Sequence, residues 1–319
     1  MTGPAVAIVP PGKLAYGMQL PVAAQSRHFA QPWEATAGRD EILRIAPACD
    51  RHGFFYLAVS DHVAVPRAAA ETMSTTWYDA IATLGFLAAA TTNVRLLSYV
   101  WVLAYRHPLA SAKAFATLDA LSQGRVIIGV GAGHLQGEFE MLGVPFTGRG
   151  RRLDEAIDLL ALALEEEYPR FSGDVWQVAD MGQRPRPLQQ PRPPIWVGGS
   201  SPAALRRAAE RGDGWLPQGV PDMGMEAAIS SIREHRARTR GDEPIEIGMN
   251  SPFLYVGAPP GEMPPGTLSG VAEPFASQLR RRRHLGGRHM GVRFRTRSCD
   301  ELLDQIEAFG TEVGPLLDD

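Results

Sequence analysis

The sequence predicts an α/β protein, a (β/α)8 or TIM barrel, because eight short apolar runs alternate with stretches of helical periodicity. The apolar runs are continuous rather than alternating, which is typical of parallel strands buried on both faces. The chain of 319 residues exceeds the usual barrel by roughly 70 residues, which leaves room for inserted loops. We expect one domain over residues 1–319, with residues 1–14 as an irregular N-terminal tail.

Each of the first four predicted strands precedes a helix whose apolar residues recur three or four positions apart. These strands are predicted over Ala15–Leu20, Phe54–Val59, Arg95–Val102 and Val126–Val130. The helices that follow them are marked by Ile42, Ile45, Ala46 and Cys49, ending near Gly53; by Ile81, Leu84 and Ala88; by the segment from Pro108 to Gly124; and by Leu153, Ile157, Leu160 and Leu164.

The second half repeats the pattern with shorter strands, and Gly212 is placed to end a helix in the left-handed conformation. Two segments of poor periodicity, Phe171–Pro193 and Val256–Gly270, are expected as inserted loops at the C-terminal mouth of the barrel. The strands are predicted over Ile195–Val197, Trp215–Leu216, Ile245–Met249 and Val292–Phe294, and the helices over Pro202–Arg211, Glu226–Arg240 and, behind a Ser298–Glu301 capping box, through Leu302, Leu303, Ile306 and Phe309.

The composition excludes several classes of partner. A net charge of −3 gives no general attraction to nucleic acid or to an acidic membrane, and the run Arg280–Arg283 is interpreted as a solvated face rather than a polyanion site. Cys49 and Cys299 are too few and too far apart for a disulfide framework or a metal cage. The first 13 residues lack the pattern of a signal peptide. We therefore expect a cytoplasmic protein without a metal.

The stretch from Gly198 to Pro202 combines a strand end, a flexible turn and the start of a helix. Ser201 followed by Pro202 is typical of an N-cap with proline in the first helical position. The glycines let backbone N–H groups approach a ligand, and the helix dipole adds partial positive charge at that point. Gly198, Gly199, Ser200 and Ser201 are therefore candidates to hold a phosphate, and an ordinary strand-to-helix turn is the alternative.

Asp61 and His62 follow the second predicted strand, where catalytic groups gather in a barrel. An imidazole can exchange a proton near neutral pH, and the adjacent carboxylate can orient a ligand. A pair that caps the loop is the structural alternative, and residue types alone favour it.

Three alternate glycines, Gly129, Gly131 and Gly133, follow the fourth strand and precede His134. A dinucleotide-binding fingerprint requires a third glycine where the chain has His134 or Gln136, so a nicotinamide-binding fold is disfavoured. The glycines instead predict a strand end on which a flat ring system can lie.

These motifs together resemble the luciferase-like monooxygenase superfamily, and within it the branch of F420-dependent oxidoreductases. The resemblance runs from about Ala15 to Leu317. The strings that carry it are VSDHV at Val59–Val63, YRHP at Tyr105–Pro108, TLDALSQGRVIIGVGAGHLQGEFEMLGVPF at Thr117–Phe146, and PIWVGGSSPAALRRAAERGDGW at Pro194–Trp215.

The resemblance implies a (β/α)8 barrel that forms a homodimer and binds the deazaflavin F420, with the cofactor phosphate at Gly198–Ser201. It also implies that Asp61 and His62 contact the cofactor ring, with His62 moving a proton. Members of the family often have a non-prolyl cis peptide that would fall here near Ser98, Tyr99 and Val100, behind the ring. Flavin-using members tend to carry an arginine where this chain has Ala132 or Gly133, which favours F420 over FMN.

Further positions bear on the substrate and the chemistry. The sugar-phosphate dehydrogenases of the family carry a glutamate at the position similar to His134, and a tryptophan where this chain has Pro66. His134 is either a replacement acid–base group or a steric neighbour of the ring. His107 is interpreted as an N-cap or core residue, and Trp101, Trp196 and Trp215 as barrel packing.

Three functions are compared on this basis. The leading hypothesis is hydride transfer between F420 and a small organic substrate, with His62 and His134 as the catalytic candidates. The first alternative is an FMN-dependent monooxygenase that uses reduced flavin and oxygen. The second is a barrel that binds a flavin without turnover.

Overall fold

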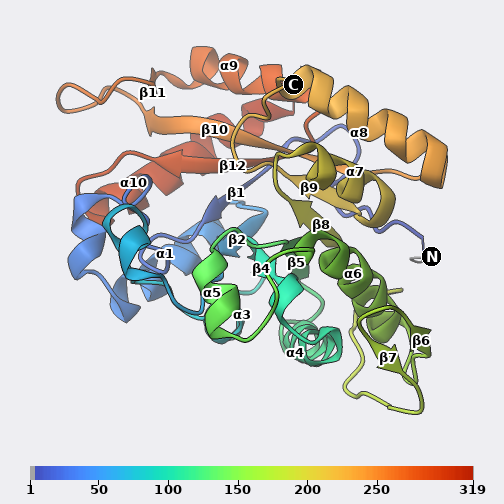
Figure 1. The fold of residues 1–319 in the computed structure, drawn as a ribbon. Helices are drawn as coiled ribbons and strands as arrows, with labels where there is room; N and C mark the ends of the chain where they lie inside the picture. Colours follow the sequence, from blue (N-terminus) through green and yellow to red (C-terminus); the bar gives the residue numbers. More distant parts are fainter. Residues whose placement is uncertain (1–3, 319) are drawn as a thin grey trace.

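The computed structural model describes residues 4–318, in which eight parallel strands close into a barrel covered by helices (Figure 1). The barrel order is β1-β2-β3-β5-β8-β9-β10-β12, and pairing between β12 and β1 completes the ring. The predicted fold is confirmed. The barrel strands are β1 (Ala15–Gln19), β2 (Tyr56–Val59), β3 (Arg95–Ser98), β5 (Val126–Gly131), β8 (Ile195–Gly198), β9 (Gly214–Leu216), β10 (Glu246–Val256) and β12 (His289–Phe294).

Helices follow the strands in the expected order. One segment taken as a loop, Val256–Gly270, differs because its end forms β11 (Thr267–Gly270), which pairs with β10. The helix α9 follows directly after it. The helices are α1 (Arg39–Arg51), α2 (Ala70–Met73), α3 (Ala80–Ala90), α4 (Pro108–Leu121), α5 (Gln136–Met141), α6 (Arg149–Glu165), α7 (Pro202–Arg211), α8 (Met225–Arg240), α9 (Ala272–His284) and α10 (Cys299–Ala308).

The barrel interior is filled by side chains that alternate inward along the strands. Leu97 and Ile127 meet Trp196 and Leu216 there, and Ile8 of the N-terminal segment packs against the same cluster. Trp196 and Trp215 are fully buried, which confirms that they pack the barrel. The interior is therefore a core, and ligands can enter only at its ends.

Two local predictions are corrected. The predicted third strand is divided into β3 and β4 (Trp101–Val102). The Tyr99–Val100 peptide between them is cis, which confirms the non-prolyl cis peptide expected there. Gly212 does end α7, but its backbone is extended (φ −88°, ψ 161°) rather than left-handed. A Cβ there would lie 2.9 Å from the carbonyl oxygen of Ala208, so close packing explains this glycine.

The segment Phe171–Pro193 does not lie over the mouth as expected. It forms a hairpin of β6 (Phe171–Ser172) and β7 (Gln177–Val178), whose turn is held by the carboxylate of Glu155 on α6. The chain then returns beneath the barrel, where Gln189 donates to the carbonyl of Val126, the first residue of β5. Hydrogen-bonding partners on α6 and on the N-terminal end of β5 therefore place this insertion away from the mouth.

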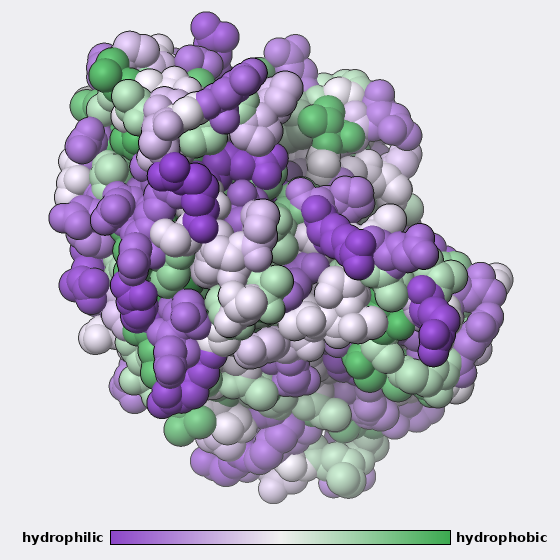
Figure 2. All heavy atoms as spheres, turned by 90° about the vertical axis from the view of Figure 1, so that its left-hand side faces the viewer, coloured by the Kyte–Doolittle hydropathy of each residue, from purple (hydrophilic) through white to green (hydrophobic). Residues whose placement is uncertain are grey.

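One face of the molecule is mostly polar. Seen from the side of Figure 1 where the loop between β10 and β11 lies, polar side chains predominate and apolar ones are scattered among them (Figure 2). No helix among residues 4–318 is long and apolar enough to cross a membrane. Cys49 and Cys299 are both buried and free.

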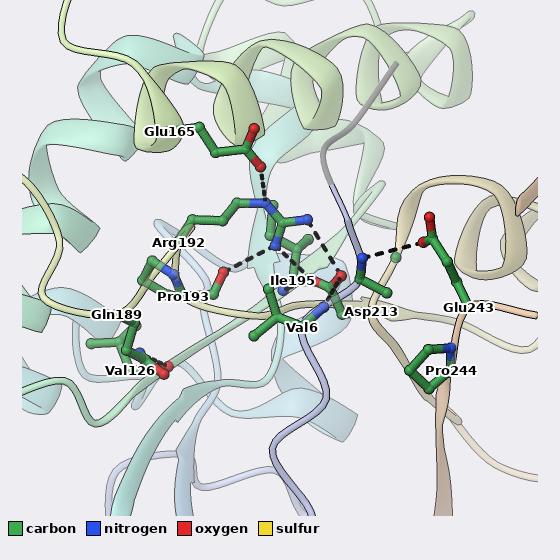
Figure 3. Close-up of polar contacts among 12 residues, drawn as sticks. Val6, Val126, Glu165, Gln189, Arg192, Pro193, Ile195, Asp213, Glu243 and Pro244 are labelled. Carbon is green, nitrogen blue, oxygen red and sulfur yellow. Dashed lines mark hydrogen bonds and ion pairs between the residues drawn. The ribbon is translucent and has the colours of Figure 1, made fainter.

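A buried ion pair holds the bottom of the barrel together (Figure 3). The guanidinium of Arg192 contacts Asp213 at 2.5 Å and Glu165 at 3.0 Å, and the Arg192 and Asp213 side chains are fully buried. Asp213 also accepts hydrogen bonds from the backbone N–H groups of Ile195 and Val6. This one carboxylate therefore joins β8 and the segment before β9 to the N-terminal segment below the barrel.

We expect Arg192→Ala to lower the free energy of unfolding by about 3–5 kcal/mol, because it leaves a buried carboxylate without its cation. Arg170, which pairs with Asp180 while both side chains are more than three-quarters exposed, is the matched control. Its alanine variant should lose at most about 1 kcal/mol. Urea unfolding at pH 7 measures both values, and equal losses would contradict the assignment.

Candidate functional site

The structure brings the predicted site residues to one rim of the barrel. They follow the carboxyl ends of β2, β3, β5 and β8, which lie next to one another in the barrel order. Parallel strands place all their carboxyl ends on the same side, where barrel enzymes build their sites. The residues are Asp61 and His62 after β2, Ser98 and Tyr99 at the end of β3, Gly131, Ala132, Gly133 and His134 at the end of β5, and Gly198, Gly199, Ser200 and Ser201 at the end of β8.

His62 is held by a glutamate that sequence analysis missed. Its Nδ1 lies 2.9 Å from Oε2 of Glu138 on α5, and Oε1 of the same carboxylate accepts the N–H groups of Val63 and Ala64. Burial acts to raise the pKa of Glu138, but the bonds from His62 and the backbone outweigh it and hold that pKa below its ordinary value. Because a carboxylate only accepts, Nδ1 carries the hydrogen, and Nε2 of the neutral ring is left to accept a proton.

Two more rings enclose the His62 imidazole. The ring of Trp77 packs edge-on at 4.5 Å between centroids, and His134 lies at 5.4 Å. Partial desolvation lowers the pKa of His134, and its closeness to the His62 imidazole lowers it further. The site therefore holds two imidazoles side by side, one paired with a carboxylate and one with a lowered pKa.

The carboxylate of Asp61 points to the barrel wall. It forms a two-pronged ion pair with Arg106, at 2.5 and 2.8 Å, and accepts the N–H of Val102 in β4. Burial acts to raise the pKa of Asp61, and the Arg106 charge opposes that rise. Arg106 also lies 3.6 Å above the ring of Trp101. Asp61 thus fixes the loop that carries His62 to the neighbouring strand, as the structural alternative supposed.

The segment between β3 and β4 covers the glycines of β5 and β8. A Cβ at Gly131 would lie 2.5 Å from Val100, and one at Gly198 would lie 2.6 Å from it. The hydroxyl of Ser98 is buried and donates to the carbonyl of Gly129. The flat surface predicted from the glycines is therefore covered by the Val100 side chain, and a ring would lie above Val100 rather than on the strand.

The turn after β8 has the predicted helix-start geometry. The Ser201 side chain caps α7 by accepting the N–H of Ala204, and Gly199 has φ +119°, a conformation open to glycine. The Ser200 hydroxyl bridges Gln218 and Gly219 after β9. Within residues 4–318, no acceptor binds the backbone N–H groups of Ser200 and Ser201. An anion can therefore be received there.

His107 also has the local role predicted for it. It stands before the proline that opens α4, and its Nδ1 accepts the N–H of Leu109 as an N-cap. The contacts missed from sequence, those of Glu138 and Arg106, join residues that are 76 and 45 positions apart. No local spacing indicates such pairs, although both residues stand inside strings that carry the family resemblance.

Comparison with known protein families supplies the identification, because luciferase-like monooxygenases match residues 18–263. The chain belongs to this family. Its members are oxidoreductases or monooxygenases, and relatives that use F420 and relatives that use FMN both match this chain.

The individual relatives show how far the likeness reaches. The F420-dependent glucose-6-phosphate dehydrogenase of Nakamurella multipartita is 30% identical over 65% of this chain and 61% of its own length. The FMNH2-dependent dimethylsulfone monooxygenase of Pseudomonas putida is 34% identical over 45% of this chain and 40% of its own. The chain spans about half the length of the curated relatives it matches.

A solved structure confirms the fold over nearly the whole chain. An F420-dependent secondary alcohol dehydrogenase in complex with an F420-acetone adduct superposes with a TM-score of 0.74 at 19% identity, covering 96% of this chain and 100% of its own. The arrangement of strands in this family member is therefore that of its solved relatives.

The lowered pKa of Glu138 predicts a pH-dependent stability. Folding favours its carboxylate, so this contribution is present above the ordinary pKa of 4.5 and is lost as pH falls through the lower folded value. Wild type should exceed Glu138→Gln in unfolding free energy at pH 7, and the difference should shrink below pH 4.5. Urea titrations at pH 7, 5 and 4 measure it. Glu140→Gln, at an exposed position of α5, should change stability less at pH 7, and a pH-independent difference for Glu138→Gln would refute the idea.

Proposed function

We propose that this luciferase-like protein is an F420-dependent oxidoreductase that transfers a hydride between the deazaflavin and a small organic substrate. The observation that carries the proposal is the His62–Glu138 pair at the barrel rim, on the same rim as a glycine turn that can receive a phosphate. The F420-dependent relative of Nakamurella multipartita supports the choice of cofactor. Bound F420 would supply the two-electron chemistry, and the protein would supply position and proton transfer.

The residues present fit such a cofactor. The N–H groups of Ser200 and Ser201 at the start of α7 would receive its phosphate. The ring would lie at the rim above Val100, with Tyr99 behind it and Gly131, Ala132 and Gly133 beside it. The carboxylate of Asp61 is occupied by Arg106, so Asp61 would act by positioning His62 rather than by touching the cofactor.

His62 would move the proton that accompanies hydride transfer. The Glu138 carboxylate holds Nδ1–H, so Nε2 is the atom that can take or return a proton. Trp77 and His134 enclose the ring and limit access of water. His134, whose pKa is lowered first by partial desolvation, would present a neutral imidazole that can hydrogen-bond a substrate oxygen.

A second candidate is an FMN-dependent monooxygenase. The observation that favours it is the FMNH2-dependent relative of Pseudomonas putida, which is 34% identical over the part it shares with this chain. The same phosphate turn and the same rim would hold FMN. The resemblance at the Asp61–His62 pair favours F420. The relative affinities of the protein for F420 and FMN therefore distinguish the two candidates.

Titration of the purified protein with F420 and with FMN, followed by cofactor fluorescence, tests the choice. We expect F420 to bind at least about tenfold more tightly than FMN, a difference of about 1.4 kcal/mol. Tight FMN binding with oxygen consumption in the presence of reduced FMN would instead establish the monooxygenase. Binding of either cofactor without turnover of any alcohol, ketone or enone would support a barrel that only binds flavin.

The role of His62 predicts a kinetic effect. With a compound that supports F420 turnover, His62→Ala should lower kcat by about 10²–10⁴-fold, the usual contribution of a positioned acid or base. The dissociation constant of F420 should change little. His284→Ala, at an exposed position of α9, is the control and should leave kcat unchanged. Stopped-flow absorbance of the cofactor measures the rate, and an unaltered kcat in His62→Ala would remove His62 from the mechanism.

A further inference from the structure

Arg293 stands on the inner face of the barrel at its mouth. It belongs to β12, where residues two apart share a face. His289, four positions earlier on the same strand, stacks on Trp196 inside the barrel at 4.1 Å between ring centroids. The alternation therefore places Arg293 above this core, near the carboxyl end of the strand.

Arg293 is partly buried and has no acidic partner among the described residues. Its guanidinium donates to Oε1 of Gln19 at 3.3 Å and lies 3.7 Å from the ring of Phe29. Buried Arg125 also lacks an acidic partner there, but its guanidinium donates to several backbone carbonyls and to a threonine hydroxyl. Arg106 and Arg192 each reach a carboxylate at 2.5 Å. Among residues 4–318, none of the Asp and Glu side chains pairs with Arg293.

The surroundings of Arg293 leave its charge poorly compensated. Burial lowers the pKa of Arg293, and the hydroxyls of Tyr99 and Tyr56 oppose this only in part. A desolvated cation without a counter-ion is costly, and an arriving anion would relieve that cost. A guanidinium also presents two parallel N–H donors, which match the two oxygens of a carboxylate.

Two small cavities flank the guanidinium. One, of about 20 Å³, lies inward between Arg293 and polar groups of Gln19, Tyr56, Tyr99 and Asn250. The other, of about 50 Å³, lies outward beside Phe29. A water needs about 10–15 Å³ of such space. The space beside the guanidinium is therefore enough for a water or for part of a small polar group that enters from the mouth.

Arg293 lies across the mouth from the cofactor turn. In the barrel order, β12 stands between β10 and β1, whereas the turn at Gly198–Ser201 follows β8, which stands between β5 and β9. The glycine-rich half of the rim would hold the cofactor. The half around β1 and β12 carries polar side chains, among them Gln19 and Arg293, that can face a substrate. We infer that Arg293 binds an anionic group, a carboxylate, of the organic substrate. The assignment of this anion to a substrate rests on the proposed function, whereas anion binding at Arg293 can be tested independently of it.

Ligand-observed fluorine NMR with 4-fluorobenzoate and its neutral isostere 4-fluorobenzamide tests the site on the full chain at low salt. Wild type should bind the carboxylate at least about tenfold more tightly than the amide, the size expected for a hydrogen bond to a charged group. Arg293→Gln should lose this preference, and Arg293→Lys should keep part of it. Thermal unfolding of each variant verifies that it is folded.

Arg295→Gln is the matched control. Arg295 is two residues further along the chain, stacks on Phe253 at 3.4 Å and lines neither cavity, so its loss removes the same charge from another place. The control should keep the preference for the carboxylate. Equal binding of the two probes by wild type, or an undiminished preference in Arg293→Gln, would overturn the inference.

A further arm separates substrate from cofactor. Bound F420 should leave 4-fluorobenzoate binding intact, and Arg293→Gln should bind F420 as wild type does. Displacement of the probe by F420, together with weakened F420 binding in Arg293→Gln, would assign Arg293 to the acidic tail of the cofactor and overturn the inference. If F420 does not bind at all while the carboxylate preference persists, the proposed function fails and the anion site stands.

Discussion

The geometry of the site depends on the carboxylate of Glu138. It accepts three hydrogen bonds from one short stretch after β2, namely from His62, Val63 and Ala64. Glu138 itself is carried by α5, which follows β5, so the bond ties together loops that arise two strands apart in the barrel. A single buried anion thus sets both the path of the loop and the hydrogen-bonding state of the imidazole it carries.

The barrel order brings the loops after β2 and β5 within reach of each other. A second carboxylate, that of Asp61, constrains the same loop. Asp61 binds Arg106 and the N–H of Val102, so it ties the same loop to β4 on the strand side. His62 therefore stands between two fixed points, Asp61 at its own backbone and Glu138 at its ring. Such a double constraint limits the rotamers of the imidazole and leaves Nε2 aimed by the scaffold rather than by a ligand.

Local sequence patterns predicted what depends on local physics. Strands and helices followed from apolar runs and periodicity, and the caps at Ser201 and His107 followed from residue types that accept backbone N–H groups. The pairs Glu138–His62 and Arg192–Asp213 join residues far apart in the chain and carry no periodic signal. The hairpin at Phe171–Ser172 and Gln177–Val178 shows the same limit, because a composition rich in proline and arginine marks an insertion without telling which end of the barrel it covers.

The partners of the arginines differ between the wall and base of the barrel and one half of its mouth. Arginines account for 30 of the 32 basic residues, and two of those buried in the wall or base, Arg192 and Arg207, reach carboxylates. These pairs stabilise only because each desolvated charge has its partner within the chain. Arg293 has no such partner at the barrel mouth, on the half away from the glycine turn. A desolvated cation that no carboxylate of the described residues compensates gives this part of the opening an electrostatic preference, and a ligand with an anionic head group is the chemistry that satisfies it.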